Sequence, residues 1–142
     1  EKIIANSKHG AVRYTRCQED TDLSAVQVFI LDTVGLLAGA YSYATWSYIG
    51  GGFGVGIHNT LEAATFGLPI AFGPNYQKFK EARDMVALGA ATKVESADEL
   101  EAWFKPLRDD AAHLAHTSTI ARDYTTKNQG ATPLIMQVVF GK

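Results

Sequence analysis

The sequence contains little cysteine, no marked excess of charge of either sign and no long hydrophobic run. Its single cysteine, Cys17, cannot form an internal disulfide, and such sparse use of cysteine fits a reducing compartment. No apolar stretch reaches the ~18 residues that a membrane-spanning helix needs. Thirteen basic and fifteen acidic residues give a formal net charge of −2, which argues against a nucleic-acid-binding surface or a polybasic membrane anchor. The sequence therefore predicts a soluble protein without nucleic-acid partners.

What is present is the composition of a globular domain, with 46% apolar and 20% charged residues. The 142 residues allow one compact domain, residues 1–142, and a domain of this size buries roughly 68–70% of the surface of its unfolded chain. The chain begins at Glu1 rather than Met, and no signal-peptide pattern follows. We therefore expect it to be a piece of a longer protein.

Short apolar runs alternate with longer helical stretches, a pattern typical of an α/β fold with a parallel sheet. Strands are expected at residues 11–15, 26–31, 46–49, 69–72 and 91–94. Helices are expected at residues 36–44, 60–66, 77–88, 96–104, 106–127 and 133–140. Ser96 followed by Glu99 predicts a capping box at one helix start. Residues 1–8 also suggest a helix, so an opening strand of the sheet would precede the chain.

Ligands of such sheets bind outside the carboxyl ends of the strands, in the loops that lead into helices. The loops that meet this condition are residues 32–35, 50–59 and 73–77. Asp32 either caps the following helix or faces the site, and Gly35 is a possible ligand contact. Residues 73–76 have the composition of a turn.

The main feature is a glycine-rich loop, with five glycines among residues 50–56. Glycine allows a positive φ and a close approach of ligand to backbone, so the N–H groups of such a loop can bind an anion. The dipole of the helix that starts near Thr60 would add to this effect. The loop fits neither a Walker motif nor the G-x-G-x-x-G spacing, which disfavours a nicotinamide or flavin cofactor. A flexible hairpin-like connection is the alternative. We predict a nucleotide site that includes Gly52, Gly54 and Gly56.

The residues after the glycines allow two interpretations. Asn59 and Glu62 form a helix cap, or Glu62 accepts hydrogen bonds from a ribose diol, as acidic residues do in nucleotide sites. His58 is a hydrogen-bond donor to phosphate, a general acid, or simply a polar residue where the chain enters a helix. His113 and His116 lie three residues apart, yet we interpret them as part of a solvated helix face rather than a metal site. No metal and no nucleophilic triad is predicted, and Cys17 has no neighbours that would activate it.

Two stretches carry a family resemblance: GGGFGVGIHNTLEAATFGLPIAFGPNYQKFKEARDM at residues 50–85 and FILDTVGLLAGAYSYATWSYIGGG at residues 29–52. Through them the chain resembles the C-terminal domain of 3-deoxy-D-manno-octulosonic acid (Kdo) transferases. The resemblance covers residues 11–95, and the helical tail is compatible with it. It implies a Rossmann-like α/β fold, a parallel sheet flanked by helices, that forms the C-terminal half of a GT-B glycosyltransferase.

The resemblance also implies what this half binds. The donor would be CMP-Kdo, and the acceptor a lipid A precursor in lipopolysaccharide biosynthesis at the cytoplasmic face of the bacterial inner membrane. The CMP contacts that it implies are Val34, Gly35, Leu36, Asn59, Thr60, Leu61 and Glu62. Most members have Glu at the position of Leu36, so only a backbone contact is expected there. No cofactor is implied.

The resemblance places the catalytic carboxylate and the membrane contact in an N-terminal domain, outside this chain. By itself the chain is therefore expected to bind nucleotide weakly and to transfer nothing. Two alternatives are a donor domain for a UDP-sugar in an enzyme of the same architecture and a stand-alone nucleotide-binding module.

Overall fold

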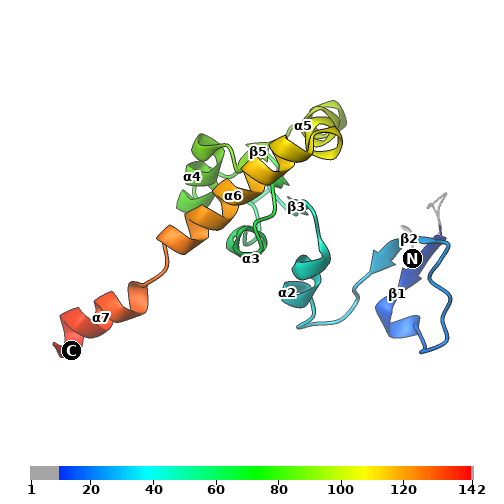
Figure 1. Ribbon diagram of the computed structural model, residues 1–142, viewed down its shortest axis with the longest axis horizontal. Coiled ribbons are helices and arrows are strands. Elements are labelled where there is room, and N and C mark those ends of the chain that lie inside the picture. Colours follow the sequence, from blue (N-terminus) through cyan, green and yellow to red (C-terminus); the bar gives the residue numbers. More distant parts are fainter. Residues whose placement is uncertain (1–9, 142) are drawn as a thin grey trace. The chain divides into compact units, whose positions relative to one another are not determined.

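The computed structural model describes residues 10–141 (Figure 1). The helix expected at residues 1–8 therefore lies outside the described residues. The first elements are β1 (Gly10–Arg13), the 3₁₀ turn η1 (Tyr14–Arg16), β2 (Val26–Ile30), α2 (Leu37–Ala40), the 3₁₀ turn η2 (Tyr41–Tyr43), β3 (Ser47–Ile49) and α3 (Leu61–Thr65). They are followed by β4 (Ile70–Phe72), α4 (Lys80–Leu88), β5 (Ala91–Lys93), α5 (Ala97–Asp109), α6 (Ala111–Lys127) and α7 (Ala131–Phe140). The chain divides into two compact units, one ending at Ala40 and the other starting at Tyr41.

The first unit is built on a parallel pair of strands, β1 and β2, with Val12 opposite Phe29. Side chains of β2 alternate between half-buried and exposed, as the period of two in a strand requires. Beyond the strands, both carboxylate oxygens of Asp32 accept hydrogen bonds from Thr15, one from its backbone N–H (3.1 Å) and one from its hydroxyl (2.7 Å). Asp32 therefore joins the ends of the two strands and does not cap α2.

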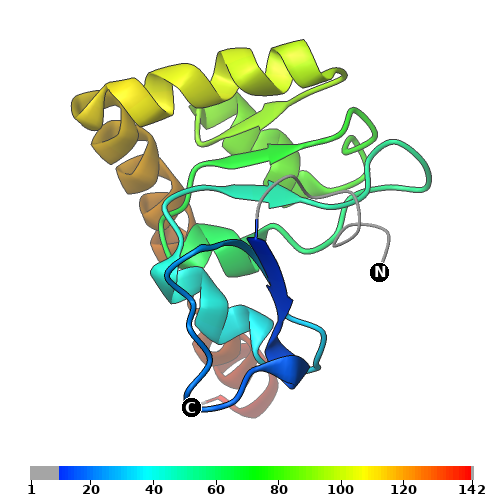
Figure 2. The same cartoon turned by 90° about the vertical axis from the view of Figure 1, so that its right-hand side faces the viewer.

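The second unit holds a parallel three-stranded sheet in the order β3-β4-β5. The central strand β4 consists only of Ile70, Ala71 and Phe72, all 0% exposed. A short, wholly apolar strand fits this position, because a parallel sheet is covered on both faces. The parallel order confirms the expected fold, and it brings the loops after β3 and β4 to the same end of the sheet (Figure 2).

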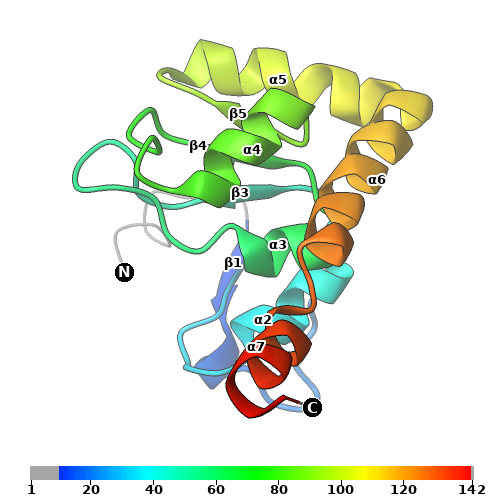
Figure 3. The ribbon, with the colours of Figure 1, turned by 90° about the vertical axis from the view of Figure 1, so that its left-hand side faces the viewer.

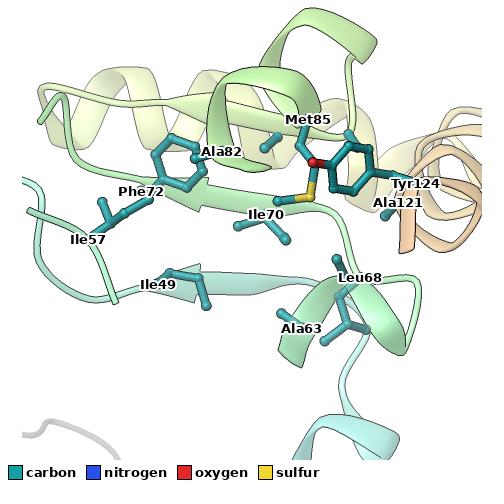
Figure 4. Close-up of a cluster of buried hydrophobic side chains, with 13 residues drawn as sticks. Ile49, Ile57, Ala63, Leu68, Ile70, Phe72, Ala82, Met85, Ala121 and Tyr124 are labelled. Atoms are coloured by element: carbon teal, nitrogen blue, oxygen red, sulfur yellow. The ribbon is translucent and has the colours of Figure 1, made fainter. Parts of the chain in front are cut away.

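The core of the second unit lies between this sheet and helices α3, α4 and α6 (Figures 3 and 4). Ala82 and Met85 of α4 pack over β4 and are both 0% exposed, and the partly buried Phe79 and Val86 pack against the same core. Gly89 ends α4 in the left-handed conformation with φ +84°. Its lack of a Cβ makes it the favoured residue there.

The predicted helix bounds are wrong in two places. The helix expected at residues 36–44 is only the short α2 followed by η2. The break expected near Pro106 lies instead at Asp110, whose side chain accepts hydrogen bonds from the N–H groups of Ala112 and His113 and so caps α6. Pro106 lies inside α5, where Phe104 packs edge-on against Trp46 and Leu107 is buried. These contacts outweigh the hydrogen bond that proline cannot donate.

The predicted capping box of α5 forms in part. The Ser96 hydroxyl accepts a hydrogen bond from the Glu99 N–H (3.1 Å), while the Glu99 carboxylate accepts one from the Glu95 N–H (2.8 Å). Within residues 10–141, every helix is too short or too polar to cross a lipid bilayer.

Candidate functional site

The glycine-rich loop folds into a small hairpin at the carboxyl end of β3. Gly51 and Ile57 form an antiparallel bridge. The Gly52 N–H donates to the Gly56 carbonyl (2.8 Å), and the His58 N–H donates to the Gly50 carbonyl (3.1 Å). The loop therefore has the shape of a hairpin, with residues 53–55 at its tip.

Asn75, in the loop that follows β4, holds this tip from one side. Its backbone N–H donates to the Gly52 carbonyl (2.9 Å), and its side-chain Nδ2 donates to the Gly54 carbonyl (2.9 Å). The backbones of the two loops also touch, since a Cβ on Gly52 would lie 2.7 Å from the Gly73 Cα. These contacts bring together two of the three loops that the sequence selects.

The glycines of the hairpin have different backbone requirements. Gly51 and Gly52 have φ values of +88° and +82°, and Gly56 has +155° with the Phe79 ring beside it. Gly54 has no positive φ, and a Cβ there would meet open space. Close approach to the backbone therefore requires glycine at position 52 but not at position 54.

The face of the hairpin turned away from Asn75 is open. Phe53 and Val55 are exposed, while Gly52 is buried. Within residues 10–141, the N–H groups of Phe53 and Val55 donate to no protein acceptor. Free N–H groups on a tight turn are the kind of donor that binds an anion.

The segment after the hairpin forms local hydrogen bonds at the start of α3. Asn59 accepts a hydrogen bond from the Leu61 N–H (3.0 Å), and its side-chain amide donates to Oε1 of Glu62 (3.0 Å). Both side chains are exposed, so the Glu62 carboxylate keeps acceptor capacity for a ligand. Thr60 is 1% exposed, and its hydroxyl has no hydrogen-bond partner among the described residues.

Helix α3 has only five residues, so its dipole is small. Few aligned peptide groups add up along so short a helix, so the dipole of α3 adds little to anion binding at its start.

Two side chains flank this segment. His58 is exposed beside the hairpin. Tyr41 is half-buried, and burial together with the nearby negative charge of Glu62 raises the pKa of its hydroxyl. Tyr41 therefore remains neutral and available as a hydrogen-bonding group at neutral pH.

The remaining predicted contacts lie in the first unit. Val34 is fully exposed, Gly35 has φ +91°, and Leu36 is partly exposed. This turn follows Asp32, and the hydrogen bonds from the Thr15 hydroxyl and N–H hold the pKa of Asp32 below its usual value. The turn thus starts from a fixed, ionised carboxylate.

Two other features lie apart from the hairpin: a histidine pair on α6 and a cavity beside β3. His113 and His116 are exposed on α6, and among residues 10–141 no three His, Cys, Asp or Glu side chains gather as a metal site would require. A cavity of about 340 Å³ lies between β3 and α5, lined chiefly by Trp46, Tyr48 and Trp103. It includes none of the predicted site residues.

The sequence did not indicate that Asn75 contacts the glycine-rich hairpin. Asn75 lies in a turn that the sequence places at the correct end of the sheet, but its partner Gly54 is 21 residues away. Only the parallel strand order and the close approach of Gly73 to Gly52 bring these residues together.

The fold, parallel strands flanked by helices, is shared with a solved structure. The crystal structure of the C-terminal CMP-Kdo binding domain of WaaA from Acinetobacter baumannii aligns with a TM-score of 0.68, at 23% identity, over 84% of this chain and 64% of that one. This likeness confirms the expected fold.

The sequence relatives are Kdo transferases. The 3-deoxy-D-manno-octulosonic acid transferase of Rickettsia typhi is 33% identical over 109 residues, which is 75% of this chain and 24% of that protein. The enzyme of Bordetella pertussis is 34% identical over 109 residues, 75% of this chain and 26% of that protein. The enzyme of Chlamydia pneumoniae is 27% identical over 131 residues, 90% of this chain and 29% of that protein.

The resemblance to the Kdo transferases is therefore confirmed. The chain spans about a quarter of the length of the curated relatives it matches. No protein-family model matches the sequence.

Proposed function

We propose that residues 1–142 form the donor-binding domain of a Kdo transferase. In this function the domain holds CMP-Kdo while the Kdo group passes to a lipid A precursor. The observation that carries the proposal is the 33–34% identity to Kdo transferases over three quarters of the chain, joined to the fold of a CMP-Kdo binding domain.

The predicted residues can supply the contacts that a cytidine nucleotide needs. The exposed Glu62 carboxylate would accept hydrogen bonds from the ribose hydroxyls, as acidic residues do in nucleotide sites. Backbone groups of Val34, Gly35 and Leu36 would contact the nucleotide from the turn after β2. The open face of the hairpin would offer N–H donors to the phosphate.

The chemical step needs more than this chain. Acid–base catalysis requires a group within hydrogen-bond reach of the acceptor hydroxyl. We place that group, the lipid A acceptor contacts and the attachment to the bacterial inner membrane in an N-terminal domain of the full-length protein. The 142-residue chain alone would then bind nucleotide without transferring Kdo.

An amide chemical-shift titration of the chain with CMP, with UDP as control, tests the proposal. The expected result is that CMP shifts resonances of Gly35, residues 50–56 and residues 59–62, and that UDP shifts them less. A preference for UDP would instead assign the chain to an enzyme that uses UDP-sugars. Shifts confined to the cavity between β3 and α5 would place the ligand site elsewhere.

A further inference from the structure

We propose that Asn75 is a positioning residue that turns two backbone N–H groups, those of Phe53 and Val55, toward the phosphate of the bound nucleotide. This inference rests on the proposed function and names a contact within that site. It starts from the two hydrogen bonds that Asn75 donates, to the carbonyls of Gly52 and Gly54.

Each of these hydrogen bonds fixes a whole peptide group. The peptide bond is planar and trans, so the carbonyl of one residue and the N–H of the next point in opposite directions. Because the Gly52 carbonyl points to Asn75, the Phe53 N–H points away from it. Because the Gly54 carbonyl also points to Asn75, the Val55 N–H points away as well.

The two N–H groups are therefore on the same, open side of the hairpin. Both lack a protein acceptor within the described residues, and the opposite side of the hairpin is closed by Gly73 and by the Phe79 ring. Two unpaired N–H groups that both point away from Asn75 suit an anionic oxygen. Of the parts of CMP, only the phosphate carries such an oxygen.

This arrangement assigns different tasks to neighbouring residues. Gly52 allows the backbone to turn and to touch Gly73. Asn75 selects the orientation of the peptide groups at the tip, which the glycines alone would leave free to rotate. The donors come from Phe53 and Val55, the two residues of the tip that are not glycine.

Asn75→Asp is the sharpest variant, because it keeps the shape of the side chain and replaces the amide donor by a carboxylate. The carboxylate cannot donate to the Gly54 carbonyl and repels it. Gln77→Glu is the matched control: Gln77 is an exposed amide in the same loop, its Nε2 donates to the Pro74 carbonyl, and the substitution adds the same charge.

Binding of CMP and of cytidine to the wild-type chain and both variants gives the test. We expect Asn75→Asp to weaken CMP binding roughly three- to tenfold, the range that the loss of one hydrogen bond implies. Cytidine, which has no phosphate, should bind the wild-type chain and Asn75→Asp equally, and Gln77→Glu should bind CMP as the wild-type chain does. A purely structural role of Asn75 would lower the affinity for both ligands together.

A second pair of variants tests the donor directly. Val55→Pro removes the N–H group, and Val55→Ala keeps it; Val55 is fully exposed, so neither change removes core packing. We expect Val55→Pro to lose CMP affinity and Val55→Ala to keep it. Both variants should bind cytidine as the wild-type chain does.

The outcomes separate this inference from the function on which it rests. If the wild-type chain binds CMP and Asn75→Asp binds it as tightly as Gln77→Glu, the positioning role is wrong and the proposed function stands. Equal loss of CMP and cytidine in Asn75→Asp also overturns it. If the wild-type chain does not bind CMP, the proposed function fails, and this inference fails with it.

Discussion

At the scale of single residues, Glu62 combines a local hydrogen bond with an exposed carboxylate. Asn59 occupies Oε1, so Glu62→Gln leaves a side chain of the same shape that can still accept from Asn59. We expect CMP affinity to fall roughly five- to tenfold, because a neutral amide accepts more weakly than a carboxylate from ribose hydroxyls. Calorimetric titration measures this change.

The thermal midpoint of Glu62→Gln should stay at the wild-type value. Glu101→Gln serves as the control, since Glu101 is another exposed acid, whose partner is Lys105 on the surface of α5. Unchanged CMP affinity in Glu62→Gln would leave only the structural role beside Asn59.

Tyr124 and Asp84 form a hydrogen bond between α6 and α4, with 2.9 Å between the phenol oxygen and Oδ2. Tyr124 is 8% exposed. We expect Tyr124→Phe to lower the free energy of unfolding by about 1 kcal/mol near neutral pH, the usual net worth of one hydrogen bond. Urea unfolding measures it.

The pH dependence of this difference follows from both groups. Hydrogen bonds from Lys80 and then from Tyr124 lower the pKa of Asp84, so its contribution to stability is lost as the pH falls below about 4. Burial, followed by the hydrogen bond to Asp84, raises the pKa of Tyr124 to about 12. Its contribution is complete below pH 10 and is lost as the pH rises toward 12. A difference between wild type and Tyr124→Phe that stays constant from pH 3 to pH 12 would contradict this assignment.

At the scale of elements, the hairpin after β3 and the loop after β4 behave as one piece because Gly52 and Gly73 touch. Gly52→Ala places a Cβ 2.7 Å from the Gly73 Cα at a residue with φ +82°. We expect a loss of about 2 kcal/mol in the free energy of unfolding, from overpacking and backbone strain together. Gly54→Ala, in the same hairpin, should change it by less than about 0.5 kcal/mol, and equal losses in the two variants would be inconsistent with the contact.

Elements with local signals were predictable from the sequence. The strands were predictable because they are short apolar runs. Gly89 marks the end of α4 because no other residue adopts its positive φ as readily. Pro106 misled the prediction, because what keeps α5 intact there is the packing of Phe104 on Trp46, 58 residues earlier in the chain. That contact depends on the fold.

For the candidate site, the placement of the loops was predictable from the sequence, but the contacts between them were not. Strand order places the glycine loop and residues 73–77 at one end of the sheet, which the sequence pattern is sufficient to predict. The hydrogen bonds of Asn75 to Gly54 and of Thr15 to Asp32 join residues 21 and 17 positions apart. Local propensity carries no signal for such pairs.

At the scale of the whole molecule, α7 presents apolar side chains to solvent. Its exposed residues are Leu134, Ile135, Met136, Val138, Val139 and Phe140. An apolar surface of this kind promotes association, and we expect the 142-residue chain to dimerise with rising concentration in sedimentation experiments.

Replacing Val138 and Val139 by Lys should weaken that dimer at least tenfold, because each buried Val contributes about 1.5 kcal/mol. Leu88→Lys, at an exposed position on α4, is the control. A chain that remains monomeric at every concentration would contradict the prediction.

The hydrogen bonds between Thr15 and Asp32 also have a practical consequence. They fix the carboxyl ends of β1 and β2 to each other, just before the turn at residues 34–36. Residues 18–25, mostly exposed, instead connect η1 to the start of β2, which is held by its pairing with β1. Loops whose ends are held in this way accept inserted residues at small entropic cost. A peptide tag inserted there should therefore leave the turn at residues 34–36 unaltered.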